Sequence, residues 1–358
     1  MSLLGCLIWY TVILDSIGSL LSFYCLKREN FMSKLNRATG WNYQPSEPIK
    51  YNPLFDFPPK LDLIFGWMIK RWVSISRFLL FFVLALILTK YLTPSLSIMG
   101  EVDYSWVTYL FMRNTALLFL VAGTLHLYLH ILKVQGDDYK FLKKEMAKNN
   151  KKFKFRNQVY DNIFWSVFSG VTIWTFYEAI YWYGVANGIV GTSSFQSSPI
   201  QFFLWILCLP LIRGVHFYSI HRLLHVPFLY KHVHVTHHRN VNTGPWSGIS
   251  MHPVENIIYQ SSPLIHIFIP TDPMIFTLHL ILVTLNPAFT HSGFEQIKNK
   301  KTKLLDSADF HHQLHHRYFD CNYGNMDVPL DVWFGTHHDG SEEATKAMRL
   351  RMKGAATK

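Results

Sequence analysis

Residues 200–238 read IQFFLWILCLPLIRGVHFYSIHRLLHVPFLYKHVHVTHH, an apolar stretch that passes directly into a run of histidines. The first part is long enough to cross a membrane, because about 20 largely apolar residues suffice for a spanning helix. The second part carries two histidine clusters at helical spacing. This junction predicts a membrane protein that presents histidine side chains beside one end of a spanning helix.

The chain as a whole has the composition of a lipid-embedded protein. Apolar residues make up 49% of the 358 residues and charged residues 16%, whereas soluble domains have about a quarter charged. Disordered, collagen-like and small disulfide-rich chains are excluded. The four cysteines form no CxxC pair and indicate no oxidising compartment. We interpret the net charge of +11 as a topology signal and expect no nucleic-acid partner.

Five stretches are predicted to span the membrane as helices. They cover residues 3–26, 74–93, 106–132, 161–184 and 200–219. The first is expected to be a retained helix, because no basic leader and no small-residue cleavage site accompany it.

A sixth apolar stretch, residues 257–290, is interrupted by the sequence PTDP at 270–273. The break leaves arms of about 13 and 17 residues, each short for a full crossing. We predict a re-entrant helical hairpin, with Pro263 and Pro287 as further kinks. The alternative is another spanning helix, which would put His291 on the opposite side. The predicted fold is therefore an all-α integral membrane protein with about five transmembrane helices, the hairpin and a helical, histidine-rich metal-binding cap.

The distribution of basic residues predicts the orientation of the chain. Segment 27–60 carries six Lys/Arg and segment 133–156 carries nine, whereas 94–103 and 185–199 carry none. Because basic loops stay in the cytoplasm, both basic segments and the histidine clusters are expected on the cytoplasmic face. The predicted division of the chain is a transmembrane platform (1–199), a histidine-rich region (200–340) and a basic carboxyl-terminal tail (341–358).

Histidines are the unusual feature of the sequence, since seventeen of the nineteen follow residue 215. Eight of them form three clusters at offsets of four, or of three and four, which lie on one face of a helix. Imidazoles on one helix face can converge on a metal ion at about 2.0–2.1 Å. These candidate ligands are His221, His225, His234, His237, His238, His312, His315 and His316.

The number of histidines favours two metal ions over one. A structural zinc site is complete with four ligands, usually including cysteine, and no cysteine lies in these clusters. Two ions that each hold four or five imidazoles fit the count. Imidazole suits zinc, copper, iron and nickel, so residue type does not choose the metal. A histidine-rich surface or a pH sensor is the alternative, but neither requires these offsets.

The other histidines are interpreted one by one. His291, after the hairpin, is predicted to be a further ligand, and His252, before the hairpin, is either a ligand or a residue that supports one. His311 is expected to support a ligand, and His126 and His130 to line a helix contact. We expect packing roles for His216, His266 and His279, no direct role for His337 and His338, and we prefer His234 to His232 as a ligand. Acids that could orient ligand rings are Glu255, Glu295, Asp306, Asp309, Asp320, Asp327 and Asp331.

Four strings together resemble the sterol desaturase and fatty acid hydroxylase superfamily. They are HRLLHVPFLYKHVHVTHH (221–238), HPVEN (252–256), HSGFE (291–295) and FHHQLHHRYFDCNYG (310–324). The resemblance covers about residues 200–340. It implies a non-haem di-iron centre, held by the eight clustered histidines with His291 and His252, that activates O2 to hydroxylate or desaturate a membrane lipid. Three intervening residues in the first cluster favour the sterol-desaturase-like branch.

The activity implied by the resemblance needs electrons from outside the chain, because the sequence has no GxGxxG and no CxxCH signature. A b-type cytochrome, a ferredoxin or a reductase is the expected donor, and a bacterial inner membrane or the endoplasmic reticulum the expected location. Zinc could replace iron in purified protein. Two other functions stay open: a di-zinc membrane hydrolase, which would need no O2, and a metal transporter or metal-binding protein, whose ligands should be spread through the spans.

Overall fold

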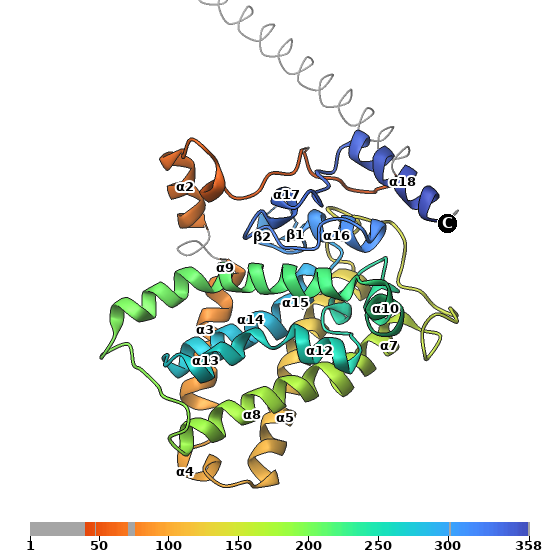
Figure 1. The fold of residues 1–358 in the computed structure, drawn as a ribbon. Helices are drawn as coiled ribbons and strands as arrows, with labels where there is room; N and C mark the ends of the chain where they lie inside the picture. The colour runs from red at the N-terminus through yellow and green to blue at the C-terminus, as the bar shows by residue number, and fades with distance from the viewer. Residues whose placement is uncertain (1–39, 47, 71–75, 301, 357–358) are drawn as a thin grey trace, which may run out of the picture.

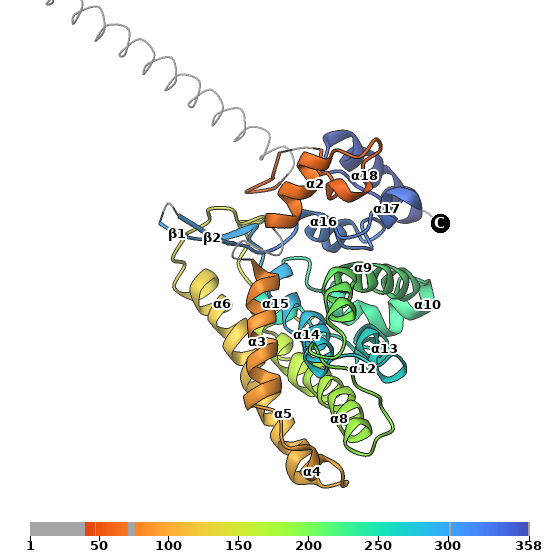
Figure 2. The same cartoon turned by 90° about the vertical axis from the view of Figure 1, so that its left-hand side faces the viewer.

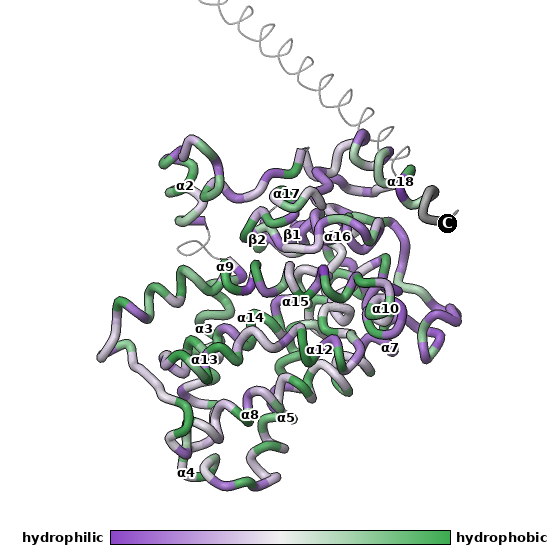
Figure 3. The backbone as a smooth tube through the Cα atoms, in the orientation of Figure 1, coloured by the Kyte–Doolittle hydropathy of each residue, from purple (hydrophilic) through white to green (hydrophobic). Residues whose placement is uncertain are grey.

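The computed structural model describes residues 40–46, 48–70, 76–300 and 302–356, and the predicted span 3–26 lies outside them. The described part is mostly helical and has two levels, a platform of long helices and a smaller cap above it (Figure 1). Green, hydrophobic backbone concentrates in the platform, the loop after the helix that ends at Ile131 is largely purple, and the cap is mixed, with green at residues 61–68 (Figure 3). The platform therefore has the composition predicted for a lipid-embedded region.

Two long helices confirm predicted spans in the first half of the chain. The first is the continuous helix Tyr104–Ile131, and the second is Gln158–Ala186. Each contains wide π-type turns within an otherwise α-helical run. Their parts are α5 (Tyr104–Leu118), η3 (Phe119–Gly123), α6 (Thr124–His126), η4 (Leu127–Ile131), α7 (Gln158–Trp165), η5 (Ser166–Val171) and α8 (Thr172–Ala186). Asp103 and Asn157 begin the two runs by accepting hydrogen bonds from backbone N–H groups of the first turn.

Helix α9 (Pro199–Leu224) confirms the fifth predicted span, 200–219, and leads to the histidines. It starts with proline, which suits the first position of a helix, and tolerates Pro210 in its interior. It runs directly beneath the cap in both views (Figures 1 and 2). Helix α3 (Arg77–Tyr91) occupies the predicted span 74–93 but has only 15 residues in helical conformation. It packs beside the later helix Pro273–Thr284 and is joined to α5 through α4 (Leu96–Met99).

The apolar stretch 257–290 forms the predicted hairpin, with one difference. Its outgoing arm is broken into α12 (Pro253–Tyr259), η8 (Ser262–Leu264) and α13 (Ile265–Phe268). The chain turns at the predicted PTDP sequence and returns through α14 (Pro273–Thr284) and α15 (Asn286–Thr290). This returning arm is 18 residues long and apolar enough to cross a membrane, so the expectation that it would be too short was wrong. Asp272 accepts from Met274 N and thereby starts the arm immediately after the turn.

The returning arm lies at the centre of the platform. In its apolar window 78% of the residues are buried, against 33–44% for the other three candidate spans. Its neighbours include α3, α8 and α9. The arm therefore forms the core that the outer helices surround, and it carries the chain back to the histidine side.

The cap collects segments from both ends of the described chain. Its elements are η1 (Pro53–Phe55), α2 (Leu61–Met68), β1 (Gln296–Asn299), β2 (Thr302–Asp306), α16 (Phe310–Tyr318), α17 (Leu330–Trp333) and α18 (Glu342–Ala356). The antiparallel pair β1–β2 was not predicted, and the predicted tail 341–358 contains helix α18, whose Met348 is buried. Trp41, Phe141 and Phe310 share one apolar cluster, and Asn42 N donates to Phe141 O at 2.8 Å. The described part of the segment 27–60, from residue 40 on, therefore meets the segment 133–156 on the histidine side of the molecule.

Candidate metal centre

Four segments bring histidines to the junction of platform and cap. His221 and His225 end α9, and His291 follows α15 directly. The second cluster lies on η6 (Tyr230–His234) and α11 (Val235–His238), which follow the short helix α10 (Pro227–Leu229). The third cluster lies on α16. Because all of these elements are helical, the offsets of three and four residues do place the rings of each cluster on one side.

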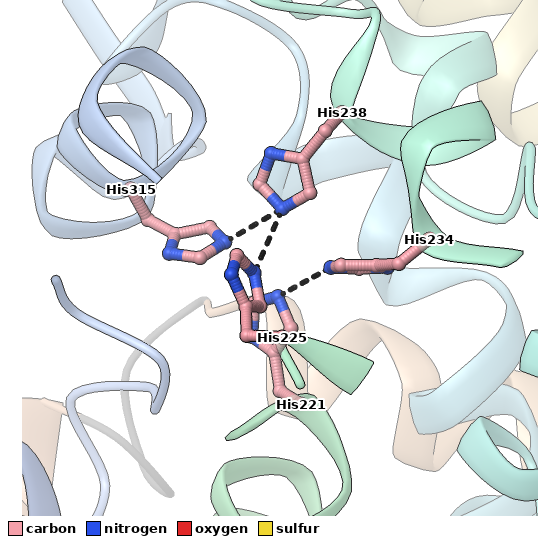
Figure 4. A group of neighbouring side chains, drawn as sticks. All are labelled: His221, His225, His234, His238 and His315. Atoms are coloured by element: carbon pink, nitrogen blue, oxygen red, sulfur yellow. Dashed lines mark hydrogen bonds between the residues drawn. The ribbon is translucent and has the colours of Figure 1, made fainter. Parts of the chain in front are cut away.

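Five of the histidines form a compact group, which we name the five-histidine site. It consists of His221, His225, His234, His238 and His315. Figure 4 shows their rings converging from three segments of the chain. The Nε2 atoms of His221 and His234 lie 3.1 Å apart, as do those of His225 and His238, and the Nε2 atoms of His238 and His315 lie 3.0 Å apart.

Four others form a second group, the four-histidine site, which consists of His237, His291, His312 and His316. The Nε2 atom of His291 lies 3.4, 3.2 and 3.1 Å from those of His237, His316 and His312. Two nitrogens bound to one ion at 2.0–2.1 Å, with angles of roughly 90–110°, are ~2.9–3.4 Å apart. The spacing in both sites is thus the spacing of ligands that share an ion.

The two sites share their helices in a regular way. In the second cluster His234 and His238, four residues apart, belong to the five-histidine site, and His237 belongs to the other. In the third cluster the assignment is reversed, because the pair His312 and His316 joins the four-histidine site and His315 does not. The second and third clusters therefore contribute to both sites, whereas the first cluster, His221 and His225, contributes only to the five-histidine site. The two shared clusters fix the sites next to each other.

Hydrogen bonds on the outer ring nitrogens determine where the lone pairs point. The Nδ1 atoms of His221 and His315 donate to the carbonyl oxygens of Tyr323 at 2.7 Å and Cys321 at 2.6 Å. His291 Nδ1 donates in the same way to Pro287 O at 3.0 Å. A carbonyl can only accept, so each Nε2 atom keeps a lone pair directed at the other rings of its site. Facing lone pairs repel each other in a buried site, and a cation between them removes that repulsion.

The loop after α16 supplies two of these carbonyl groups. Phe319 and Asn322 have positive φ angles of 67° and 53°, which are rare for residues other than glycine. The turn places Cys321 O against His315 and Tyr323 O against His221. Strain of this kind persists only where surrounding contacts hold it. The loop therefore acts as a support for the five-histidine site.

Asp331 is the contact that holds the loop. Its carboxylate is fully buried and accepts from the N–H groups of Tyr323 and Gly324, each at 2.8 Å, and from Thr336 Oγ1 at 2.7 Å. A Cβ atom on Gly324 would lie 2.9 Å from Asp331 Oδ2, so only glycine permits this approach. Of the predicted orienting acids, Glu255 acts directly, because it accepts from His234 Nδ1 at 2.8 Å, and Asp331 acts through the backbone.

Burial keeps the imidazoles neutral. It lowers the pKa of His291 to about 4 and that of His225 to about 2. The pKa values of His234, His237, His238, His312, His315 and His316 are well below the ordinary value, first through burial and then through repulsion from neighbouring imidazoles. Neutral imidazole is the form that binds metal. Burial also raises the pKa of Glu255, and a cation held by His234 would lower it again.

His252 does not lie in either site. Its Nδ1 atom accepts from Val254 N at 3.2 Å and caps α12, and its ring lies beside Trp165. The prediction of His252 as a ligand is therefore not supported by its position, because helix capping uses the nitrogen and directs the ring away. His311 contacts Tyr51 Oη at 3.1 Å, outside both sites.

The remaining histidines contact other parts of the chain. His126 and His130 stack on each other, and His130 Nε2 lies 2.9 Å from Ser292 O, which agrees with a helix contact. His266 and His279, expected only to pack, lie 3.0 Å apart through ring nitrogens. The sequence analysis missed this contact, and the spacing of thirteen residues gave no signal for it.

A cavity of about 530 Å³ reaches one of the two sites. Its wall includes His237, His291 and His312 of the four-histidine site, and no member of the five-histidine site. It extends past Tyr259 and Val283 between the hairpin and α9. A second space of about 10 Å³, enough for roughly one water molecule, lies between the sites against His221, His234 and His237.

The residues fit a pair of metal ions. The donor set is neutral imidazole throughout, the lone pairs converge, and the two groups are of the size that the histidine count predicted. The four-histidine site opens to a cavity that can take a small molecule, since ligand pockets are commonly about 300–1,000 Å³. The arrangement can hold two ions side by side and bring a substrate to one of them.

Comparisons with known proteins find a family match over the histidine-rich region. The sequence model of the fatty acid hydroxylase family matches residues 205–336. A "Delta(7)-sterol 5(6)-desaturase" of Gibberella zeae is 36% identical over 39% of this chain and 45% of its own length. A second one, from Aspergillus fumigatus, is 32% identical over 39% of this chain and 52% of its own length.

A "Putative methylsterol monooxygenase" of Dictyostelium discoideum is 33% identical over 42% of this chain and 56% of its own length. The chain thus spans about half the length of the curated relatives it matches. No solved structure gives a significant match. The matched region contains both histidine sites and the loop that supports them.

Proposed function

The chain belongs to the sterol desaturase and fatty acid hydroxylase superfamily, and we propose that it is an O2-dependent oxidoreductase that hydroxylates or desaturates a membrane lipid of the sterol type. The observation that carries this proposal is the pair of adjacent all-imidazole sites, of which one faces a cavity. Residues 200–340 would form the catalytic region on the platform 1–199.

The proposed ligands are the nine histidines of the two sites, with His252 left out because of its position. Two iron ions are the proposed occupants, and zinc could replace them in purified protein. Lipid C–H bonds do not react with acids or bases of a protein, and a redox-active metal supplies the missing ability to activate O2. The protein provides positioning: carbonyl groups fix the tautomers of His221, His315 and His291, and burial excludes water.

The sterol class is proposed from the names of the relatives and from the cavity. The relatives in Gibberella zeae, Aspergillus fumigatus and Dictyostelium discoideum are named as sterol or methylsterol enzymes. The cavity is large enough for a ring system and is lined deep inside by apolar residues such as Phe217, Leu282 and Val283. A lipid could place one carbon beside His237, His291 and His312.

Each turnover would need two electrons from an external donor. Hydroxylation combines the substrate R–H with O2, two electrons and two protons to give R–OH and one water. Desaturation uses the same reactants and gives a double bond and two waters. A b-type cytochrome, a ferredoxin or a reductase could supply the electrons. With the basic segment 133–156 and the described residues 40–46 on the histidine side, the cytoplasmic face of a bacterial inner membrane or of the endoplasmic reticulum is the proposed location.

Mass spectrometry of lipids from cells that express the chain under ¹⁸O2 tests the proposal. Hydroxylation would add one ¹⁸O atom to a lipid, and desaturation would remove two hydrogens only when O2 is present. A variant with His237→Ala is the matched control and should give neither product. A lipid change that continues without O2 would contradict the proposal and would favour hydrolysis.

A further inference from the structure

A chain of four polar side chains crosses the apolar hairpin. Ser262 Oγ lies 3.1 Å from His279 Nε2, His279 Nδ1 lies 3.0 Å from His266 Nε2, and His266 Nδ1 lies 3.0 Å from Thr271 Oγ1. All four side chains are buried, Ser262 being the most accessible at 8%. Polar groups within a membrane-embedded core are costly and are therefore functional candidates.

A count of the protons in this hydrogen-bonded chain shows whether Ser262, at its end, can donate or accept a further hydrogen bond. Two hydroxyl groups and two neutral imidazoles carry one proton each, and three contacts use three of the four protons. If Thr271 donates to His266, each following group donates in turn, and the Ser262 hydroxyl proton is left over. In the opposite arrangement Ser262 donates to His279, His279 to His266 and His266 to Thr271. The Ser262 oxygen can then only accept a further hydrogen bond. Ser262 can therefore act either as donor or as acceptor toward a further group.

Ser262 lines the 530 Å³ cavity that also contains His237, His291 and His312 of the four-histidine site. The lining includes apolar residues such as Phe217, Leu282 and Val283, and also the polar residues Arg213 and His216. Ser262 is the member of the hydrogen-bonded chain that reaches the cavity, since His279, His266 and Thr271 do not line it. Its neighbour Ser261 donates to Ile258 O at 2.8 Å, lies with Oγ 3.0 Å from His216 Nε2, and does not itself line the cavity.

We propose that Ser262, oriented by His279, His266 and Thr271, binds an uncharged hydroxyl group of the lipid substrate inside the cavity. An alcohol both donates and accepts, which matches the two proton arrangements of the chain. The inference rests on the proposed function for the identity of the reacting lipid. Arg213 also lines the cavity, so an anionic head group such as a sulfate is the competing ligand chemistry.

Binding measurements on the full chain in lipid nanodiscs test this inference without turnover. A labelled Δ7-sterol would be displaced by the unlabelled sterol, by its 3-deoxy analogue and by its 3-sulfate. The ratio of the affinity for the alcohol to that for the deoxy analogue is measured in the wild type and in the variant. Comparing the two ratios cancels the different partitioning of the probes into lipid. Ser262→Ala should reduce the preference for the alcohol over the deoxy analogue by about 3- to 10-fold, the contribution of one hydrogen bond.

Ser261→Ala is the matched control and should keep the wild-type preference. An unchanged preference in Ser262→Ala, or tighter binding of the sulfate than of the alcohol in the wild type, would overturn the inference. If the protein forms an oxidised lipid but does not prefer the alcohol to the deoxy analogue, the proposed hydroxyl-binding site would be wrong and the proposed function would stand. If the protein prefers the alcohol but forms no oxidised lipid, the hydroxyl site would stand and the proposed function would fall.

Discussion

The two histidine sites use the same residue type but have different surroundings. In the five-histidine site, His221, His234 and His315 are each tied through Nδ1 to a carbonyl group or a carboxylate, and the large cavity does not touch the site. In the four-histidine site His291 is tied to Pro287 O at 3.0 Å and His237 interacts with the backbone of Ser250, and three of its members line the cavity.

This difference suggests a division of roles between sites that share their helices. Because the second and third clusters each serve both sites, the helical spacing alone cannot make one site reactive toward substrate. The surroundings make that distinction: the strained loop 319–324 encloses one site, and the hairpin leaves space beside the other. The hydrogen-bonding groups around the rings are thus as important as the rings themselves.

The largest expected effect comes from removing one ligand of each site. His237→Ala and His315→Ala should each lower the metal content from two ions to one and reduce turnover by more than about 100-fold, since changes to groups behind a ligand already cost 10–100-fold. Elemental analysis with lipid mass spectrometry measures both quantities. His237→Ala should lose the ion of the four-histidine site and His315→Ala that of the five-histidine site. Absorption spectra of the cobalt-substituted variants would show which site is empty.

His252→Ala is the matched control, because that ring lies outside both sites. It should retain two ions. Full metal content in His237→Ala or His315→Ala would remove the residue from the proposed ligands, and loss of an ion in His252→Ala would contradict the assignment of the sites.

Asp331→Asn should weaken the five-histidine site selectively. The amide keeps the volume of the carboxylate but cannot accept on both sides, so the N–H of Tyr323 or Gly324 loses its partner. The carbonyl groups that fix His221 and His315 would then move. We expect a loss of about 10–100-fold in metal affinity at this site, measured by chelator competition, with the four-histidine site unchanged.

Asp320→Asn, an exposed change in the same loop, should leave both affinities as in the wild type. Equal weakening of both sites by Asp331→Asn would mean that Asp331 supports the fold of the cap in general. It would not then act as a positioning residue for one site.

Most of the metal centre was predictable because helical spacing is a local property. The offsets in His234–His238 and His312–His316 placed the rings on one side of each helix, and all eight clustered histidines and His291 do meet. The hairpin turn was predictable for a similar reason, since PTDP contains two prolines that end one helix and begin the next. The spans 106–132, 161–184 and 200–219 followed from the length of their apolar runs.

The distribution of ligands between the sites could not be predicted, because it depends on how α11 and α16 face each other. The role of Asp331 could not be predicted either. Asp331 acts on His221 and His315 only through backbone atoms of the loop that follows α16. His252 resembled a ligand by its place before the hairpin, but its Nδ1 atom serves as a helix cap. Contacts of this kind depend on tertiary packing and leave no periodic signal.

Val283→Phe should impair access to the four-histidine site only. Val283 lines the cavity and is 4% exposed, so a larger ring would project into the space proposed for the lipid. Turnover per enzyme at low substrate should fall by about 10-fold or more, the usual cost of a misfitting apolar contact, while two ions remain bound. Val215→Phe, on the exposed face of α9, should have no such effect. Normal turnover in Val283→Phe would mean that the lipid does not reach the four-histidine site through this cavity.

The smallest effect is expected from protonation of His291 in metal-free protein. Burial lowers the folded-state pKa of His291 to about 4, whereas an unfolded histidine titrates near 6.5. Between pH 6.5 and 5.5 the unfolded chain therefore binds more protons than the folded chain, and the free energy of unfolding falls as the pH falls. The loss is about 1 kcal/mol for this one residue over that interval.

Unfolding of metal-free wild type and His291→Gln at both pH values measures the contribution. The variant lacks the titrating group, so its free energy of unfolding should fall by about 1 kcal/mol less than that of the wild type. Between pH 8.5 and 7.5, where histidine is neutral in both states, the two proteins should change in parallel. Equal pH dependence below 6.5 would mean that His291 takes up a proton in the folded protein, and a protonated ring could not present a lone pair to the four-histidine site.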